Sequence, residues 1–563
     1  MDAPPDLIQP AADDAGAADA GLGLNPLIGF GTADLLAGYR HLAEQAVQHP
    51  FVTLEHQIEL ARKLLLALLG RSNLEPARGD RRFTDEAWTS NPLYRTLLQG
   101  YLAWRDSLDA WVGKTGFDLV NEQRARIALS QLGEALAPTN SWLGNPAAIR
   151  RCFETAGAST LRGLQHMLQD WTQNGGLPSQ VDKRAFRVGD NLAATDGAVI
   201  FRNPQVELIQ YTPKTEHVWS RPLLIVPPQI NKFYLFDIAP GRSLVEYLLT
   251  SGIQVFVVSW RNPTAEHRDW GLDSYVNSLV QIADVTRAVT QSEDLNMVAA
   301  CSGGITASAL LGHLTAKGDK AINATTLLVT VLDTSIESQL GPLMTREVIE
   351  ASGASSRLRG VLEGDELGRM FAWMRPNDLI WNYWVNNYLL GNDPPAFDLL
   401  YWNADTTRLP ARLHSDFLNL LLHNPLPKAG ALSVAGTPID LSKVSCDSFV
   451  VGGTTDHITP WQACYASTQI LGGQREFVLS TSGHIQSVIN PPGNARSKFF
   501  VNRQLPVDPE AWLAGAQQHE GSWWDHWRDW LVARSGTFRP ASSAIGDSQL
   551  PLAKAPGTYV FNT

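Results

Sequence analysis

The chain has 563 residues, a formal net charge of −11 at neutral pH, and 44% hydrophobic but only 18% charged residues. This length suffices for one large core or for two to three domains, and the low charge with 18 tryptophans indicates either a big core or an apolar face that meets another protein, a lipid or a polymer. Because phosphate binding needs a basic surface, the negative charge argues against a general nucleic-acid binder, and we expect no nucleic-acid partner.

The first 25 residues are rich in Ala, Asp and Pro and lack both the basic and the apolar stretch of a secretory signal. We expect residues 1–25 to form a disordered acidic tail. No apolar run approaches the ~18 residues of a transmembrane helix, one of the densest being residues 64–69. The pattern therefore predicts a soluble, intracellular protein without a transmembrane segment.

The four cysteines (Cys152, Cys301, Cys446 and Cys464) show neither CxxC spacing nor the density of a disulfide framework. This is typical of reduced thiols, and it implies no zinc site. Neither a phosphate-binding P-loop motif nor a dinucleotide-binding glycine motif between a strand and a helix is present. The sequence therefore suggests no metal and no nucleotide cofactor.

Residues from about 30 to 175 contain mostly apolar positions spaced as on one face of a helix. Clusters of turn-forming residues interrupt them, and the last cluster, at residues 174–178, marks a boundary. We predict a mainly helical N-terminal domain at residues 26–180.

After this boundary, short apolar runs bounded by turn residues alternate with helical patterns. The candidate strands are residues 198–201, 207–211, 223–226, 254–259, 297–300, 326–332, 448–451 and 476–479. This alternation is typical of an α/β fold with a mostly parallel sheet, which we assign to residues 181–563. Between about 335 and 441 the pattern turns helical and rich in tryptophan, which predicts an insertion over the active site.

Residues 296–305 form an apolar run that ends in Cys301, Ser302 and two glycines before a helical pattern begins. This is typical of a nucleophile elbow, where a buried strand turns sharply into a helix and small residues must flank the nucleophile. Two registers fit, one with Cys301 and one with Ser302 at the corner, and sterics alone do not choose between them. A plain strand-to-helix turn with a buried cysteine is the alternative.

An acid and a histidine follow in the order of the α/β-hydrolases, each just after a candidate strand: Asp456 and then His484. Singly, each is better explained as a turn-forming aspartate or a solvated loop histidine, but together they fit a base and its orienting carboxylate. His457 is a candidate for substrate contact, with a structural role in the loop as the alternative. An oxyanion hole needs the amide after the nucleophile and one from a loop after an early strand, which makes Ser302, Ile230 and Asn231 candidates for substrate binding.

Many motifs then occur in a specific order from about residue 25 onwards. They span residues 80–83, 87–88, 91–92, 226–232, 259–263, 300–304, 374–383, 402–410, 456–461, 482–486 and 490–493. This set resembles the polyhydroxyalkanoate synthases, most closely the single-subunit medium-chain branch called class II. The resemblance implies an α/β-hydrolase fold with a cap insertion.

The resemblance also implies the chemistry and the site. The nucleophile would be Cys301, with Asp456 and His484 completing a triad, and the reaction would join (R)-3-hydroxyacyl groups from CoA thioesters into a polyester with release of CoA. Medium-chain substrates, no cofactor, a homodimer, and a cytoplasmic location on polymer granules with their associated proteins are further implications. The family usually has Gly where this chain has Ala299, and whether His484 or Asp456 deprotonates the acceptor hydroxyl stays open.

Two other functions are weighed against this one. A thiol-dependent esterase or polyester depolymerase would share the triad but admit water, and a non-catalytic granule-coat protein would explain the composition but not the triad. Because an acyl-thioester must be shielded from water, we expect residues 335–441 to be a mobile cap over Cys301, with Gly360 and Gly391 as hinge points. A rigid helical subdomain is the alternative.

Overall fold

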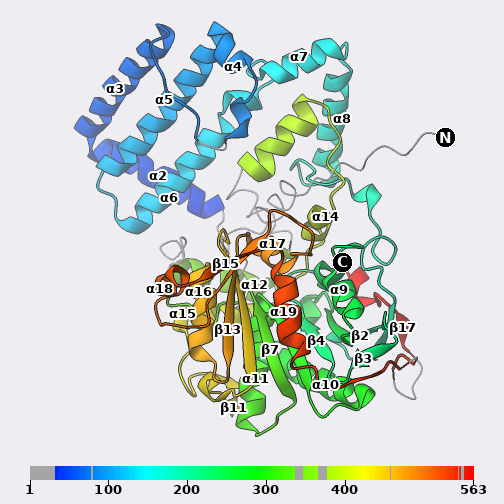
Figure 1. Ribbon diagram of the computed structural model, residues 1–563. Coiled ribbons are helices and arrows are strands. Elements are labelled where there is room, and N and C mark those ends of the chain that lie inside the picture. Colours follow the sequence, from blue (N-terminus) through cyan, green and yellow to red (C-terminus); the bar gives the residue numbers. More distant parts are fainter. Residues whose placement is uncertain are drawn as a thin grey trace, which may run out of the picture.

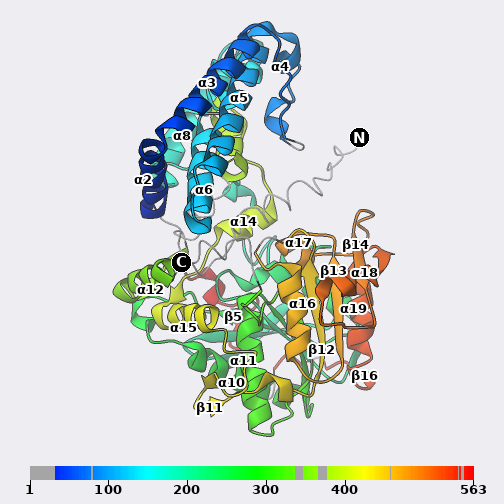
Figure 2. The ribbon, with the colours of Figure 1, turned by 90° about the vertical axis from the view of Figure 1, so that its left-hand side faces the viewer.

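The computed structural model describes residues 32–77, 80–336, 346–364, 377–456, 458–542, 544–546 and 551–563. The expected acidic tail, His457, and residues 337–345 and 365–376 of the expected cap lie outside these ranges. In both ribbon views a group of helices lies above a larger part built around a twisted sheet (Figures 1 and 2).

The first part of the chain is helical, as predicted. Its helices are α2 (Thr32–Gln48), α3 (Pro50–Leu68), α4 (Ala87–Ser90), α5 (Pro92–Lys114), α6 (Leu119–Ala135), α7 (Pro146–Glu154) and α8 (Ala158–Gln173). Two of them start with an asparagine cap followed by proline: Asn91 accepts from the Leu93 amide and Asn145 accepts from the Ala148 amide. An asparagine oxygen satisfies an amide that the first helical turn leaves free, and proline at the next position has no N–H to satisfy, so these sequences define the helix starts.

The larger part is an α/β-hydrolase fold. In the described residues its main sheet has 11 strands in the order β15-β14-β13-β12-β7-β6-β4-β5-β2-β1-β17. The central strands from β13 to β5 pair in parallel, and the flanking pairs on both sides are antiparallel. The strands are β1 (Gly197–Arg202), β2 (Val206–Tyr211), β4 (Leu223–Val226), β5 (Val255–Trp260), β6 (Leu295–Ala300), β7 (Ile322–Leu328), β12 (Asp447–Gly453), β13 (Arg475–Ser480), β14 (Lys498–Val501), β15 (Gln517–Glu520) and β17 (Ala553–Lys554).

Both faces of the sheet are buried, because alternate residues of each strand point into different cores. Leu224 and Val226 of β4 belong to one hydrophobic cluster, whereas Leu223 and Ile225 belong to the other. Burial on both faces explains why the central strands are continuous apolar runs.

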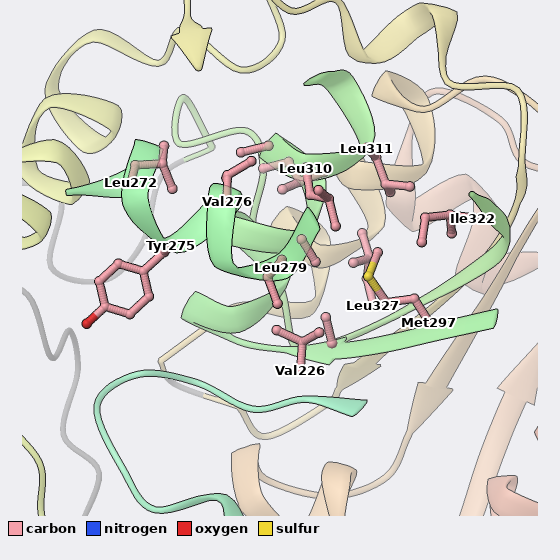
Figure 3. Close-up of a cluster of buried hydrophobic side chains, with 14 of the residues drawn as sticks. Val226, Leu272, Tyr275, Val276, Leu279, Met297, Leu310, Leu311, Ile322 and Leu327 are labelled. Carbon is pink, nitrogen blue, oxygen red and sulfur yellow. The ribbon is translucent and has the colours of Figure 1, made fainter. Parts of the chain in front are cut away.

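Helices cover each face. The first cluster receives side chains from α10 (Leu272–Thr290), α11 (Ser302–Ala316), α15 (Ala411–His423) and α16 (Trp461–Ile470). Figure 3 shows side chains of α10 and α11 meeting those of β4, β6 and β7. The second cluster receives side chains from α9 (Leu244–Thr250), α17 (His484–Val488) and α19 (Trp523–Val532).

One predicted strand is displaced. The sequence placed it at residues 326–332, but β7 ends at Leu328. Val329 takes a positive φ of 44° and donates to the Val451 carbonyl, and the Thr330 hydroxyl donates back to the Leu328 carbonyl. The apolar run therefore continues through a turn, so hydrophobicity alone extended the strand too far.

The segment between β7 and β12 divides its contacts between the two parts of the molecule. Its helix α12 (Arg346–Arg359) packs on α15. The short strands β8 (Val361–Leu362) and β9 (Leu409–Pro410) pair with each other and contact α15, and β10 (Ser433–Val434) and β11 (Thr437–Pro438) pair with each other and contact α11. Helix α14 (Asp398–Ala404) contacts the turn η4 (Phe233–Asp237), which follows the loop after β4. By contrast, the π-helical turns η7 (Asn377–Trp381) and η8 (Trp384–Leu389) lie against the N-terminal helices.

The contact between η8 and α8 is close. A Cβ on Gly163 of α8 would lie 1.9 Å from the Tyr388 carbonyl oxygen, and one on Gly391 would lie 2.1 Å from the Ser159 carbonyl oxygen. The Asn387 side-chain amide donates to the Ser179 carbonyl at 2.7 Å, and the Tyr388 hydroxyl donates to Asp170 at 2.8 Å. These contacts attach residues 384–391 to the N-terminal helices. Within the described ranges, every helix is too short or too polar to cross a membrane.

Candidate active site

Cys301 forms the corner between β6 and α11. Its backbone has φ 50° and ψ −124°, a combination that side-chain-bearing residues rarely adopt, and its amide donates to the Leu328 carbonyl at 3.0 Å. Ser302 is already the first residue of α11. Of the two registers that the sequence allowed, the fold therefore places the strained corner at Cys301.

The flanking small residues are required by close packing. A Cβ on Gly303 would lie 2.4 Å from the Pro227 carbonyl oxygen, and one on Gly304 would lie 2.0 Å from the Thr330 hydroxyl oxygen. Ala299, by contrast, is fully buried in β6 within the first hydrophobic cluster. The strand and the corner thus form with the alanine methyl in place.

Asp456 and His484 come together from two neighbouring parallel strands. Asp456 follows β12, and His484 is the first residue of α17 after β13. The His484 Nδ1 atom lies 2.7 Å from the Asp456 Oδ2 atom, and both side chains are buried. Because Nδ1 faces the carboxylate, the other ring nitrogen is the one available to Cys301.

All sides of the Asp456 carboxylate are occupied. Oδ1 accepts from the amides of Ile458 and Thr459, both at 2.9 Å, and Oδ2 accepts from the Thr459 hydroxyl at 2.6 Å in addition to His484. Burial alone would raise the pKa of Asp456, but the charge of His484 and these hydrogen bonds outweigh it and hold the pKa below its usual value. Asp456 is thus built to stay ionised.

The same pairing acts on the histidine. Burial lowers the pKa of His484, but the negative charge of Asp456, the hydrogen bond to it and the hydrogen bond to Cys301 together raise the pKa well above its ordinary value. Cys301, which is partly exposed, His484 and Asp456 therefore form one connected chain of thiol, imidazole and carboxylate.

The loop after β4 lies next to the start of α11. The Gln229 amide donates to the Ser302 hydroxyl at 3.2 Å, and the Gln229 side-chain amide donates to the Thr306 hydroxyl at 2.9 Å. Pro227 and Pro228 have no amide hydrogen, and the Gln229 amide is used by Ser302. The Ile230 amide is therefore the first in the loop that donates no hydrogen bond within the described part of the chain.

The other candidates are placed as follows. The Ser302 amide begins a helix and has no intrahelical acceptor. Asn231 forms an isolated antiparallel bridge with Thr406, and beside it the Thr407 amide donates to the Ile230 carbonyl at 3.3 Å. His457 is outside the described residues.

Sequence reasoning missed Thr459. Its hydroxyl donates to Asp456 and lies 3.1 Å from the His484 Nδ1 atom. The signal was a threonine three residues after the acid, where it closes a turn around the carboxylate. Gln229, whose amide is bound by Ser302, was also missed.

A thiol beside a buried imidazole–carboxylate pair can form a covalent acyl intermediate and pass the acyl group to water or to a hydroxyl. Among the residues that the structure describes, no cluster of three or more His, Cys, Asp or Glu could hold a metal ion. The geometry is suited to acyl transfer but does not identify the acceptor.

Comparison with known proteins bears on which acceptor receives the acyl group. A family model described as "Poly-beta-hydroxybutyrate polymerase (PhaC) N-terminus" matches residues 79–248, and a model of the alpha/beta hydrolase fold matches residues 222–491. The chain is 52% identical over 540 residues to poly(3-hydroxyalkanoate) polymerase 1 of Ectopseudomonas oleovorans, an alignment that covers 96% of each chain.

Two further relatives carry related names. Poly(3-hydroxyalkanoate) polymerase 2 of the same organism is 50% identical over 539 residues, which cover 95% of this chain and 96% of the relative. The poly(3-hydroxyalkanoate) polymerase subunit PhaC of Cupriavidus necator is 40% identical over 490 residues, which cover 85% of this chain and 83% of the relative.

Proposed function

The chain belongs to the poly(3-hydroxyalkanoate) polymerases, and from this premise we propose that it transfers (R)-3-hydroxyacyl groups from CoA thioesters onto a growing polyester, with release of CoA. It is therefore an acyltransferase. One observation carries the assignment of roles: the thiol at the strained corner, Cys301, is joined through His484 to an ionised Asp456. We propose these three residues as the catalytic triad.

In the first half-reaction His484 takes the proton of the Cys301 thiol, and the thiolate attacks the thioester carbonyl carbon. The amides of Ser302 and Ile230 would donate to the developing oxyanion. The intermediate collapses, the bond from carbon to the CoA sulfur breaks, and CoA leaves with the proton from His484. Because one thioester replaces another, the acyl group stays activated on Cys301 at nearly balanced energy.

In the second half-reaction the 3-hydroxyl oxygen of the acceptor attacks the acyl carbon on Cys301. A base must take the proton of this hydroxyl, and we assign the role of base to His484 rather than to Asp456. Both Asp456 oxygens are saturated by hydrogen bonds and its pKa is lowered, so it is a weak and inaccessible base. The bond from carbon to the Cys301 sulfur breaks, a new ester forms, and the sulfur regains the proton.

We also propose the division of the chain into an N-terminal helical domain at 26–180 and a catalytic domain at 181–563 whose insertion, about 335–441, caps the site. Two contacts support the cap: the Trp402 indole donates to the Lys232 carbonyl at 2.8 Å, and the Thr407 hydroxyl donates to the Gln229 carbonyl at 2.6 Å. The insertion thus touches the loop beside Cys301. Hydrogen exchange with a non-reactive acyl-CoA analogue tests whether it moves: protection that changes near Gly360 or Gly391 supports a mobile cap.

The proposed partners beyond substrate and polymer are the granule surface, its associated proteins and a second copy of the chain. The apolar side chains that the N-terminal helices expose support a role at such an interface. We propose a location on polymer granules in the cytoplasm.

The deciding experiment incubates the protein with (R)-3-hydroxyacyl-CoAs of increasing length and measures both CoA release and product. Insoluble polyester is the expected result, with medium-chain substrates preferred over the four-carbon one, because each buried methylene contributes about 0.8 kcal/mol. Free hydroxy acid in place of polymer would show a hydrolase. A sharp preference for the four-carbon substrate would overturn the medium-chain assignment.

A further inference from the structure

Lys232 is a buried lysine at the end of the loop that carries the Ile230 amide. Its side chain is 2% exposed. The ammonium donates to two backbone carbonyls near the other end of the chain, those of Val560 at 2.7 Å and Asn562 at 2.6 Å. A third group, the Asp405 carboxylate, lies 3.8 Å away.

A buried ammonium needs this degree of pairing, because an unsatisfied charge in a protein interior is costly. Two of the three ammonium donors are taken by the two carbonyls, and the Asp405 carboxylate lies within ion-pair distance. Lys232 thus joins a loop near residue 230 to a segment more than 300 positions away in the sequence.

That segment, residues 551–563, is itself firmly anchored. Its strand β17 pairs with β1, and the fully buried Glu207 accepts from the amides of Thr558 and Tyr559 at 2.9 and 3.0 Å. Arg202 and Arg261 lie over the Tyr559 ring, 5.7 and 5.4 Å from its centre. In both views the end of the chain lies at the side of the sheet that faces the N-terminal helices (Figures 1 and 2).

The loop is held from the other side by the insertion. Thr407 and Trp402 donate to the Gln229 and Lys232 carbonyls, as described above. These bonds fix the loop's carbonyls, whereas Lys232 fixes its far end to the segment 551–563. Since the loop has to present one amide to within hydrogen-bond distance of a transient oxyanion, small displacements cost rate.

We propose that the segment 551–563 acts through Lys232 to hold the loop at 229–232, so that the Ile230 amide is preorganised for the oxyanion. Lys232 is then a positioning residue of the reaction. This inference rests on the proposed function, because it assigns a task within the same acyl transfer.

The test is Lys232→Met, which removes the ammonium but keeps an unbranched apolar stem. We expect kcat for CoA release to fall roughly 10- to 100-fold, somewhat less than the loss of an entire oxyanion donor, while KM changes less than about twofold. The second readout is alkylation of Cys301 by iodoacetamide, followed on the Cys301 peptide by mass spectrometry. Alkylation displaces iodide at a tetrahedral carbon and forms no oxyanion, so its rate should not change.

A second variant approaches the contact from the other partner. Deleting residues 560–563 removes both carbonyl acceptors and should lower kcat to a similar extent. If the Lys232 ammonium and these carbonyls act only through each other, the variant that combines Lys232→Met with the deletion should be no slower than the slower of the two single variants. The matched control is Lys320→Met, an exposed lysine before β7, which should leave both readouts unchanged.

Three results would overturn the inference: an unchanged kcat in Lys232→Met, a parallel loss of alkylation and CoA release, or multiplicative effects in the combined variant. Failure of the proposed function would look different, because the unmodified chain would then make free acid or release no CoA. If the chain makes free acid, an oxyanion is still formed, and the effect of Lys232→Met can be measured on thioester hydrolysis instead. If the chain released no CoA at all, the assigned task would not exist and the inference would fall with it.

Discussion

The sheet-containing part buries its large apolar side chains, whereas the N-terminal helices expose many of theirs. Around the sheet, Trp523, Trp524 and Trp527 of α19 are buried almost completely. On the helices above it, Phe51 is 84% exposed and Trp171 78% exposed. Most of the large exposed apolar residues in the described chain belong to these helices or to the turns that join them: Tyr39, Val47, Phe51, Leu54, Ile58, Leu64, Leu65, Leu68, Leu69, Leu93, Leu97, Leu136, Leu143, Phe153, Leu161, Leu164, Leu168 and Trp171.

This difference teaches that the two regions are stabilised for different purposes. The sheet closes its own core on both faces and positions a strained corner that needs rigid support. The helices leave apolar surface that the described part of the chain does not cover, which is a property of surfaces that meet something else. The low charge content thus reflects both a large core and an apolar face, the two explanations between which the sequence did not choose.

Replacement of Cys301 should abolish the activity that we assign to the sheet-containing part, and it is the largest effect that we expect. Cys301→Ala removes the proposed nucleophile, so CoA release should fall by several orders of magnitude while the fold persists. The measurement is CoA release with circular dichroism as the folding control. Activity retained in Cys301→Ala would show that another residue attacks the substrate.

Asp456→Asn should cost about 10³- to 10⁴-fold in kcat, because the amide no longer stabilises the imidazolium of His484. A stability effect should accompany it. The lowered pKa of Asp456 means that its stabilisation is present above its unfolded pKa of about 4 and is lost as pH falls through the folded value. The raised pKa of His484 means that its stabilisation is present below about 6.5 and is lost as pH rises through the folded value.

The difference in the free energy of unfolding between the unmodified chain and Asp456→Asn should therefore be largest from about pH 4 to 6.5. Denaturant titrations at a series of pH values measure it. A difference that grows as the pH falls below this window would contradict the ion-pair description.

Trp527→Ala tests the closed core. The side chain is fully buried and its indole donates to the Thr326 hydroxyl at 2.8 Å, so we expect a loss of about 3–5 kcal/mol in the free energy of unfolding. Chemical denaturation provides the value. A loss below about 1 kcal/mol would show that the core around α19 repacks easily.

Ser302→Ala should have a smaller effect on activity. The substitution keeps the Ser302 amide, which is the group we propose for the oxyanion. It removes the hydroxyl that accepts from the Gln229 amide, so we expect the loop to loosen. We expect kcat to fall by about tenfold or less. A loss as large as that of Cys301→Ala would return the nucleophile assignment to Ser302.

Trp171→Ala should have the smallest effect. Because this side chain is mostly exposed on α8, the free energy of unfolding of the isolated chain should change by less than about 0.5 kcal/mol. Denaturation under the conditions used for Trp527→Ala gives a direct contrast between the two tryptophans. A loss comparable to that of Trp527→Ala would mean that the two regions do not differ in the proposed way.

The sequence by itself determined features that depend on neighbouring residues. The bounds of β4 were predicted to the residue, and the order of Cys301, Asp456 and His484 was read from positions just after apolar runs. The helical N-terminal region followed from apolar spacing and turn clusters. These features are local because helix and strand periodicity depends on residues a few positions apart.

Only the tertiary structure decided what depends on distant partners. The corner at Cys301 depends on the backbone of β7 and on the close approach of the Pro227 carbonyl. The end of β7 depends on a hydrogen bond to Val451, and the Asp456 carboxylate is held by the Thr459 hydroxyl as well as by His484. The attachment of η8 to α8 and the bonds from Lys232 to the segment 551–563 join residues hundreds of positions apart. A hydrogen bond between such residues leaves no periodic pattern in either segment, so no local reading of the sequence could have found it.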